Sequence, residues 1–384
     1  MTAALHGDFD AAMHHLRVAF AQAGPPPAQH FGGVLAAALG AMLAAIRGYS
    51  AAAGDWLERV DDAGPLPPRL ARSLIAPAAV ARAMRAIDLL DRDAAIAHLL
   101  EAGEPTSPLE IWPFVAAVWA RYERVFGSPT IGLHRLDEAI HQHRALHRTG
   151  ELAGGIVLRA RAELLLEAGE ANGVIALADE HAGHSRLAVS LARAYLRSGY
   201  PAQAIRYSSR PMRRMGTSPR ESLDHHLIVA TAQLHRGERA DAARVFARAW
   251  ELYGISGDRS AFLEVDPADL EELCRLGDVA NPVAERPLRP RPQTTLIRLS
   301  PRERVVLQAL SSDETVETIA QRLSVSVNTI RTQTRSIYRK LRVSRREDAV
   351  AVAARHSLLD PGWADTRPSL TRSDYDAEMG MTSV

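Results

Sequence analysis

The stretch SVSVNTIRTQTRSIYRKL, residues 324–341, carries four basic side chains and no acidic one. Residues on its expected inner face recur every three or four positions, the spacing that places side chains on one side of an α-helix. Ser326 precedes the first of them and is a typical N-cap residue. The expected inner-face residues are Val327, Ile330, Thr334, Ile337 and Leu341. The stretch therefore predicts a helix with one core-facing side and an opposite face that is uniformly cationic.

Three further helices are expected around this stretch, and each is marked by its first residues. Ser300 begins the motif SPRE, which has the pattern of a capping box with proline in the first turn. Thr315 is positioned to cap a second helix, and Ser344 begins the capping-box pattern SRRE of a fourth. Only the residues SVS separate the second and third helices, and so short a turn forces them to cross steeply. Residues 299–359 therefore predict a four-helix domain containing a helix-turn-helix.

The outward face of the third helix indicates a polyanionic partner. Residues 327–346 carry seven basic and no acidic side chains. The alternative is a solvated face without a partner, but such a face usually mixes the two signs of charge. A cationic helix fits the major groove of DNA, where arginine reads guanine edges and neighbouring cations neutralise phosphates. We therefore expect double-stranded DNA as the partner.

The segments LSPRERVVLQAL and IAQRLSVSVNTIRTQTRSIYRKLRVSRREDAV resemble the DNA-binding domain of LuxR-type regulators, a LuxR/FixJ-like domain. The resemblance implies a four-helix domain that binds DNA as a homodimer through its last helix. The positions that it assigns to base contacts are Arg331, Thr332 and Arg335. The positions that it places near phosphates are Asn328, Thr329 and Arg339. On the last helix, the small apolar residues expected at the dimer interface are Ala349, Val350, Val352 and Ala353.

The chain departs from the usual LuxR-type pattern at four positions. Asp313 stands where a glycine is usual between the first two helices, and Glu317 where a lysine is usual early in the second. Gln333 and Thr334 replace a frequent histidine and an aliphatic residue on the third helix. An acidic residue beside the DNA backbone is expected to weaken affinity or tilt the docked domain. These changes affect the expected operator sequence more than the expected fold.

Residues 1–285 read as a succession of helices rich in alanine, leucine and arginine. A turn residue followed by an alanine-rich helix start recurs every 30 to 45 residues, which is typical of helical-hairpin repeats. The turn positions are Gly7, Gly48, Asp91, Gly127, Gly169, Gly199 and Gly237. The last three units resemble tetratricopeptide repeats in degenerate form, and an irregular helical bundle remains the alternative. Proline-rich residues 286–298 are an expected linker, and residues 360–384 an expected disordered tail.

The helical region lacks the alternating strands and helices of a two-component receiver and the sheet of an acyl-homoserine-lactone domain. In combination with the DNA-binding end, it resembles the C-terminal part of large ATP-dependent LuxR-type activators without their ATPase domain. Lys340 is the only lysine of the chain and follows no glycine-rich loop, which argues against a Walker A site. We expect residues 1–285 to receive a signal from a protein or small-molecule effector.

Overall composition is consistent with a cytoplasmic DNA-binding protein. The net charge is +1, but 13 basic and 6 acidic residues between Arg291 and Arg355 give that segment +7 and leave −6 for the rest. The single cysteine, Cys274, fits a reducing compartment. No apolar run reaches the roughly 18 residues that a membrane span requires, and no secretory leader is recognised in the first thirty residues.

No catalytic constellation or metal site is expected. His143 and His147 share a helical face, but no third ligand is arranged beside them, so a solvated pair is the better interpretation. Cys274 is interpreted as a packed small residue and not as a nucleophile. We therefore expect a transcription regulator that has no enzyme activity and no cofactor. The alternative is a helical ligand-binding or enzymatic domain with a DNA-binding appendage.

Overall fold

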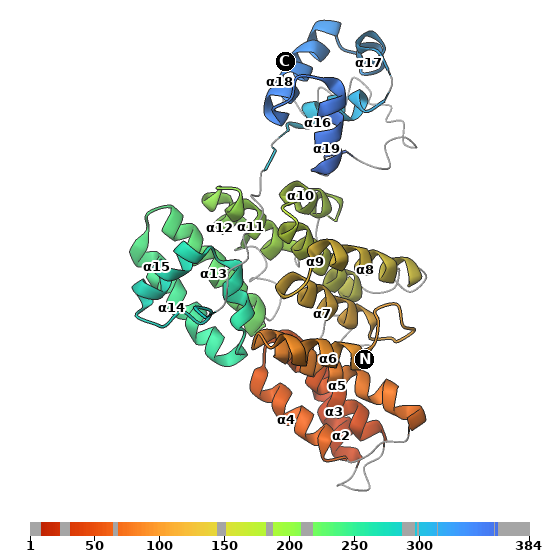
Figure 1. Ribbon diagram of the computed structural model, residues 1–384, viewed down its shortest axis with the longest axis vertical. Helices are drawn as coiled ribbons and strands as arrows, with labels where there is room; N and C mark the ends of the chain where they lie inside the picture. Colours follow the sequence, from red (N-terminus) through yellow and green to blue (C-terminus); the bar gives the residue numbers. More distant parts are fainter. Residues whose placement is uncertain are drawn as a thin grey trace, which may run out of the picture. The chain divides into compact units, whose positions relative to one another are not determined.

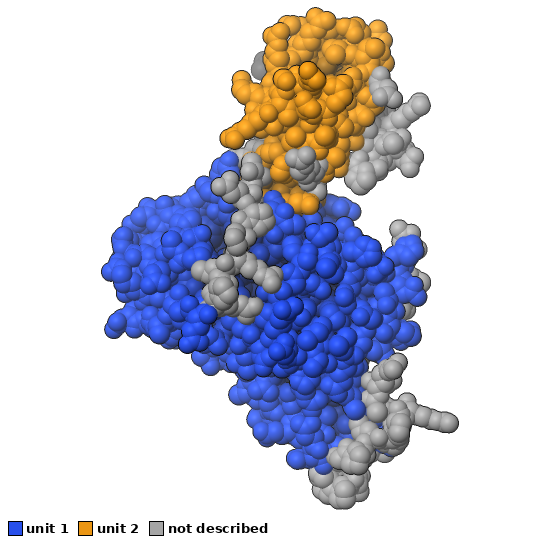
Figure 2. All heavy atoms as spheres, in the orientation of Figure 1, with its two compact units in different colours: residues 1–169, 177–294 blue, residues 170–176, 295–384 orange. Residues whose placement is uncertain are grey.

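The computed structural model describes residues 9–23, 31–63, 68–143, 151–181, 187–208, 218–285, 296–297, 299–312, 314–356 and 358–359. The chain divides into two compact units (Figure 2): unit 1 comprises residues 1–169 and 177–294, and unit 2 comprises residues 170–176 and 295–384. Within the described ranges every regular element is a helix, so the predicted all-α class is confirmed. Most of the expected linker and the whole expected tail lie outside the described residues.

Unit 1 is built from helices that follow one another as antiparallel pairs (Figure 1). Its helices are α2 (Phe9–Gln22), α3 (Phe31–Arg47), α4 (Ser50–Asp61), α5 (Pro68–Asp88), α6 (Arg92–Ala102), α7 (Trp112–Val125), α8 (Pro129–Gln142), α9 (Glu151–Glu167), α11 (Ala188–Arg197), α12 (Pro201–Ser208), α13 (Pro219–His235), α14 (Arg239–Ser256), the 3₁₀ helix η4 (Arg259–Glu264) and α15 (Pro267–Gly277). Helix α10 (Ala171–Glu180) is divided between the two units.

Tight turns join the helices of each pair, and several lie where the sequence pattern predicts them. Gly237, between α13 and α14, has a φ of 79°, a left-handed conformation that glycine adopts without steric cost. Leu90 takes a similar conformation, with a φ of 64°, in the turn before α6, and the side chain of Asp91 then caps that helix. The predicted turns at these positions are therefore real turns, while the assignment of the pairs to tetratricopeptide repeats stays a prediction.

The helical array of unit 1 does not remain open. Helix α13 packs against α3, and α14 packs against α4, although about 170 residues of chain separate them. A Cβ atom on Gly48 would lie 3.0 Å from the backbone nitrogen of Arg220, so the glycine permits this close approach. Repeats in an open solenoid contact only their neighbours. Unit 1 therefore differs from the simple array that its turn spacing suggests, because its late helices close onto its early ones.

A buried cluster of charged side chains lies where the array closes. Arg220 donates from Nη2 and Nη1 to the two carboxylate oxygens of Asp88, at 2.7 and 2.8 Å, and also contacts Asp258. Arg121 donates to Asp258 at 2.6 Å and to Ser260 at 2.7 Å. The side chains of both arginines and both aspartates are less than a tenth exposed. The cluster therefore holds α5, α7, α13 and the segment after α14 together by paired charges.

Unit 2 contains the four predicted C-terminal helices, α16 (Pro301–Leu310), α17 (Val316–Arg322), α18 (Val327–Leu341) and α19 (Arg346–Arg355). The predicted caps at Ser300, Thr315 and Ser326 are confirmed, because each side chain accepts a hydrogen bond from a backbone N–H in the first turn of its helix. The predicted cap at Ser344 is wrong. Helix α19 has Arg345 at its N-cap, without a side-chain cap bond.

A different contact fixes the start of α19. The guanidinium of Arg346 donates to the backbone carbonyl oxygens of Leu310, Ser312 and Glu314, which lie at the end of α16 and in the connection to α17. The carbonyl of Leu310 lies at the end of α16 and those of Ser312 and Glu314 lie beyond it, so none of them has a partner within that helix. Arg346 therefore links the last helix to the connection between the first two helices of the domain.

Candidate nucleic-acid interface

Helix α18 turns one face into the core of unit 2. Ile330, Ile337 and Leu341 are almost fully buried, and Val327 is half-buried at the start of the helix. Thr334 is half-buried on the same face, and its buried hydroxyl has no hydrogen-bond partner. The predicted inner face is therefore correct, although the threonine fits this site less well than an aliphatic residue would.

The six residues predicted to contact DNA lie on the outward face of α18, and the side chains of all six are exposed. They are Asn328, Thr329, Arg331, Thr332, Arg335 and Arg339. Two of the hydroxyls already have partners in the free protein. Thr332 donates to the carbonyl oxygen of Asn328 at 2.9 Å, and the Thr329 hydroxyl lies 2.8 Å from that of Ser326. The arginines therefore have more N–H groups available to a partner than any other side chain of this face.

The cationic face continues past the end of the helix. Arg342 ends α18 in a left-handed conformation, with a φ of 56°, and both it and Arg345 are exposed. Among the described residues, Arg335, Arg339, Arg342 and Arg345 have no acidic partner. The sequence showed that this segment is basic, but not that these last two arginines lie on the accessible surface. We call Arg331, Arg335, Arg339, Arg342 and Arg345 the cationic face.

Arg331 differs from the other arginines of the cationic face. Its Nη2 lies 3.5 Å from Oε1 of Glu317, which is in the first turn of α17. Both side chains remain about 60% exposed, at 61% and 60%. An ion pair this exposed is worth at most about 1 kcal/mol in water. Arg331 is therefore paired in the free protein but not locked in place.

A buried carboxylate joins α18 to α16. Glu303 accepts hydrogen bonds from the backbone N–H of Ser300 at 2.7 Å, from the Ser336 hydroxyl at 2.7 Å and from the Lys340 ammonium at 2.5 Å. Burial alone would raise the pKa of this carboxyl, but the hydrogen bonds from Lys340 and the two serines outweigh burial and lower the pKa to about 2. Lys340 is therefore part of the domain's internal support and not of its cationic face.

The Glu303 contacts predict a pH-dependent effect of Glu303→Gln. A carboxyl with a lowered pKa stabilises the fold above its ordinary value of 4.5, and this stabilisation is lost as the pH falls toward about 2. At neutral pH the substitution is expected to lower the stability of the domain by about 1–3 kcal/mol, because it weakens hydrogen bonds to a charged group. Hydrogen exchange of α16 and α18 amides, measured by mass spectrometry on the full chain, reports this change locally.

One of the two exposed acids in the first turn of α19 supplies the control, Glu347→Gln, for which no comparable effect is expected. The difference between wild type and Glu303→Gln should shrink as the pH is lowered, because wild-type Glu303 then loses its own charge. A difference that stayed constant across this pH range would contradict the role given to the ionised carboxylate.

Comparison with protein families bears on this segment. Residues 298–353 match the family described as bacterial regulatory proteins, luxR family. This segment is a LuxR-family helix-turn-helix domain. No curated protein and no solved structure matches the chain. The predicted LuxR-type resemblance is thus confirmed for the C-terminal helices, which form a DNA-binding and not a catalytic domain. The predicted likeness of the helical region to ATP-dependent activators stays a prediction.

Within the LuxR-family domain, the four residues predicted at a dimer interface differ in exposure, and the interface itself stays a prediction. Ala349 and Ala353 are fully buried in the domain's own core, and Val352 packs against that core. These side chains are used inside the domain because α19 must cover α16 and α18. Of the four predicted residues, Val350 and Val352 are partly exposed. The exposed small residues of α19 are Ala351 and Ala354, which the sequence did not single out.

Outside the LuxR-family domain, His143 and Cys274, which were considered as a metal ligand and a nucleophile, are both buried. His143 is buried, stacks on Trp112 with ring centroids 4.6 Å apart, and places Nε2 3.0 Å from the carbonyl oxygen of Pro105. His147 lies outside the described residues. Burial raises the pKa of the Cys274 thiol to about 11, so this side chain is a thiol packed in a core. In the described part of the chain, no group of side chains could hold a metal ion.

None of the helices in the described ranges combines the length and the hydrophobicity that are needed to cross a membrane.

Proposed function

We propose that the protein is a sequence-specific transcription regulator that binds promoter DNA through α18 and is modulated by its helical region. The observation that carries this proposal is the cationic face, which presents five exposed arginines on and just after the third helix of a LuxR-family domain. Helix α18 has 15 residues and is therefore about 22 Å long, which suits the major groove. The domain match supports DNA binding by this segment.

The exposed residues are given distinct roles in the proposed complex. Arg331, Thr332 and Arg335 lie in the middle of α18 and are proposed to reach base edges, where the planar fork of arginine suits guanine O6 and N7. The residues proposed to contact phosphates are Asn328, Thr329 and Arg339. Base contacts carry sequence information, and phosphate contacts fix the position of the protein. Substitutions of the two kinds should therefore differ in their effects on specificity.

This difference gives the test of the proposed function. Arg331→Ala is expected to cost about 1–3 kcal/mol on a duplex enriched by the protein from a random pool, and much less on random duplex. Arg339→Ala is expected to weaken binding to both duplexes by a similar factor. Fluorescence anisotropy with labelled duplexes measures both. If Arg331→Ala reduced the two affinities equally, Arg331 would be a phosphate contact and the proposed readout would be wrong.

Dimerisation on DNA is proposed to use the exposed side of α19, where Ala351 and Ala354 allow two helices to approach closely. A symmetric pair of domains would read two half-sites related by a two-fold axis. Ala351→Glu is expected to reduce affinity for a two-half-site duplex about tenfold or more, while affinity for a single half-site changes far less. Equal losses on the two duplexes would exclude this side of α19 as the interface.

Modulation by unit 1 is proposed to be the input of the regulator, through a protein or small-molecule effector. Such an effector must change the affinity of the full chain for duplex DNA, and the DNA must change the affinity for the effector by the same factor. Titration of the enriched duplex with and without a candidate effector measures this coupling. An effector that bound unit 1 and left DNA affinity unchanged would not be the regulatory input.

A further inference from the structure

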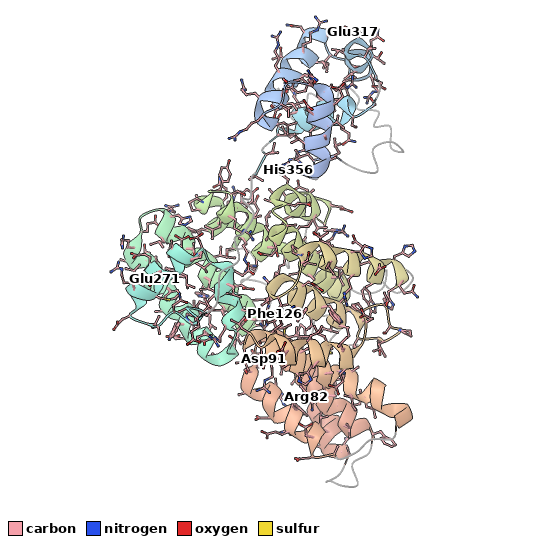
Figure 3. All side chains as sticks on the ribbon, in the orientation of Figure 1. Arg82, Asp91, Phe126, Glu271, Glu317 and His356 are labelled. Atoms are coloured by element: carbon pink, nitrogen blue, oxygen red, sulfur yellow. The ribbon has the colours of Figure 1, made fainter. Side chains whose placement is uncertain are left out.

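The ion pair between Arg331 and Glu317 joins the two helices of the helix-turn-helix on its accessible side. Glu317 belongs to the first turn of α17 and lies at the outer surface of the domain (Figure 3). Its carboxylate lies 3.5 Å from one terminal nitrogen of Arg331. The remaining arginines of the cationic face have no acidic partner among the described residues. Glu317 is thus paired with one of the two arginines that are proposed to read bases.

A carboxylate at this place affects the two kinds of DNA contact differently. In a helix-turn-helix complex the first helix crosses the DNA backbone, so the first turn of α17 is expected close to a phosphate. There the charge of Glu317 repels every duplex, whatever its sequence. In addition, the ion pair competes with a phosphate for the terminal nitrogen of Arg331 that contacts Glu317. On a random duplex, Glu317 therefore weakens both the contact between Arg331 and a phosphate and the overall electrostatic attraction.

A cognate duplex can keep the ion pair. The guanidinium has five N–H donors in a rigid fork, and the contact with Glu317 uses only one terminal nitrogen. The other donors remain free for the two acceptors of a guanine edge. Because the ion pair already restricts the guanidinium in part, Arg331 loses less side-chain freedom when it docks on that base. The pair therefore supports base readout while it opposes binding to phosphates alone.

We propose that Glu317 is a positioning residue for readout, which orients Arg331 toward a base edge and suppresses its use as a phosphate contact. The proposal rests on the proposed function, because it assigns a second residue to the same DNA site. It predicts that the charge of Glu317 raises the ratio of specific to non-specific affinity and lowers overall affinity for random DNA.

The test is a comparison of Glu317→Gln with wild type on a random duplex and on a duplex enriched by the wild-type protein. The substitution is expected to raise affinity for the random duplex about threefold to tenfold, because one repulsive charge is removed. Affinity for the enriched duplex should stay the same or fall, so that the specificity ratio falls at least about threefold. The matched control is Glu314→Gln, which removes a charge that is paired with Arg322 at 2.8 Å instead.

A double-mutant cycle separates positioning from simple repulsion. In the Arg331→Ala background, Glu317→Gln should raise affinity for both duplexes by one common factor, because no guanidinium remains to be oriented. The inference is overturned if Glu317→Gln raises both affinities equally in the wild-type background, if it changes neither, or if Glu314→Gln changes the specificity ratio as much. Wild-type protein that bound no duplex at all would instead overturn the proposed function.

Discussion

Replacing Arg220 by methionine is expected to lower the free energy of unfolding of unit 1 by about 3–5 kcal/mol. The guanidinium is 6% exposed and makes two hydrogen bonds to Asp88, a further contact to Asp258 and two bonds to carbonyl oxygens at the end of α3. Methionine fills much of the same volume but leaves two buried carboxylates facing a single arginine, Arg121. The cost of an uncompensated buried charge dominates the expected effect.

Chemical denaturation followed by tryptophan fluorescence measures this loss. The tryptophans that report on unit 1 are Trp56, Trp112, Trp119 and Trp250. The control is Arg248→Met on α14, because Arg248 and its partner Glu251 are both more than half exposed. An exposed pair is worth at most about 1 kcal/mol. If Arg220→Met cost no more than the control, the buried cluster would not be what closes the helical array.

Local features of the fold were predictable because they depend on neighbouring residues. Ser300, Thr315 and Ser326 mark helix starts by bonding to backbone groups three residues later, so sequence spacing alone reveals them. The same spacing gave a wrong N-cap at Ser344. The hydrogen bonds of Arg346 to distant backbone carbonyls fix the start of α19, and its N-cap is Arg345, one residue later. The left-handed turn at Ser324, with a φ of 54°, was also invisible, since glycine is the usual mark of that conformation.

Long-range features needed the structure. No periodicity in the sequence shows that Arg220 reaches Asp88 and the end of α3, because 132 and more residues separate these groups. The burial of Ala349 and Ala353 was hidden for a related reason. A small residue on an amphipathic helix suits both a domain core and a close contact between two helices, and only the packing of α19 on α16 and α18 distinguishes them. The exposed arginines of α18 were easier to predict, because one face of the helix must cover the core.

The second large effect is expected from salt. Each phosphate that the cationic face neutralises releases counterions, so the logarithm of the binding constant falls by about 0.9 per phosphate for each unit in the logarithm of salt concentration. Arg339, Arg342 and Arg345, the three arginines of the cationic face that are not assigned to bases, give about three such phosphates for one domain and a loss of roughly fortyfold between about 50 and 200 mM salt. Two domains on one duplex would lose about the square of that factor. Arg342→Ala and Arg345→Ala should each make this slope shallower by about 0.9, the amount that corresponds to one phosphate contact.

The most direct test of DNA binding by α18 is the salt dependence of the affinity of the full chain for a short duplex, measured by fluorescence anisotropy. We expect a straight line of negative slope on logarithmic axes, with the enriched duplex displaced to higher affinity than the random one at every salt concentration. The double variant Arg335→Ala/Arg339→Ala should give a shallower line. An affinity that did not change with salt, or no binding to either duplex at low salt, would contradict the account.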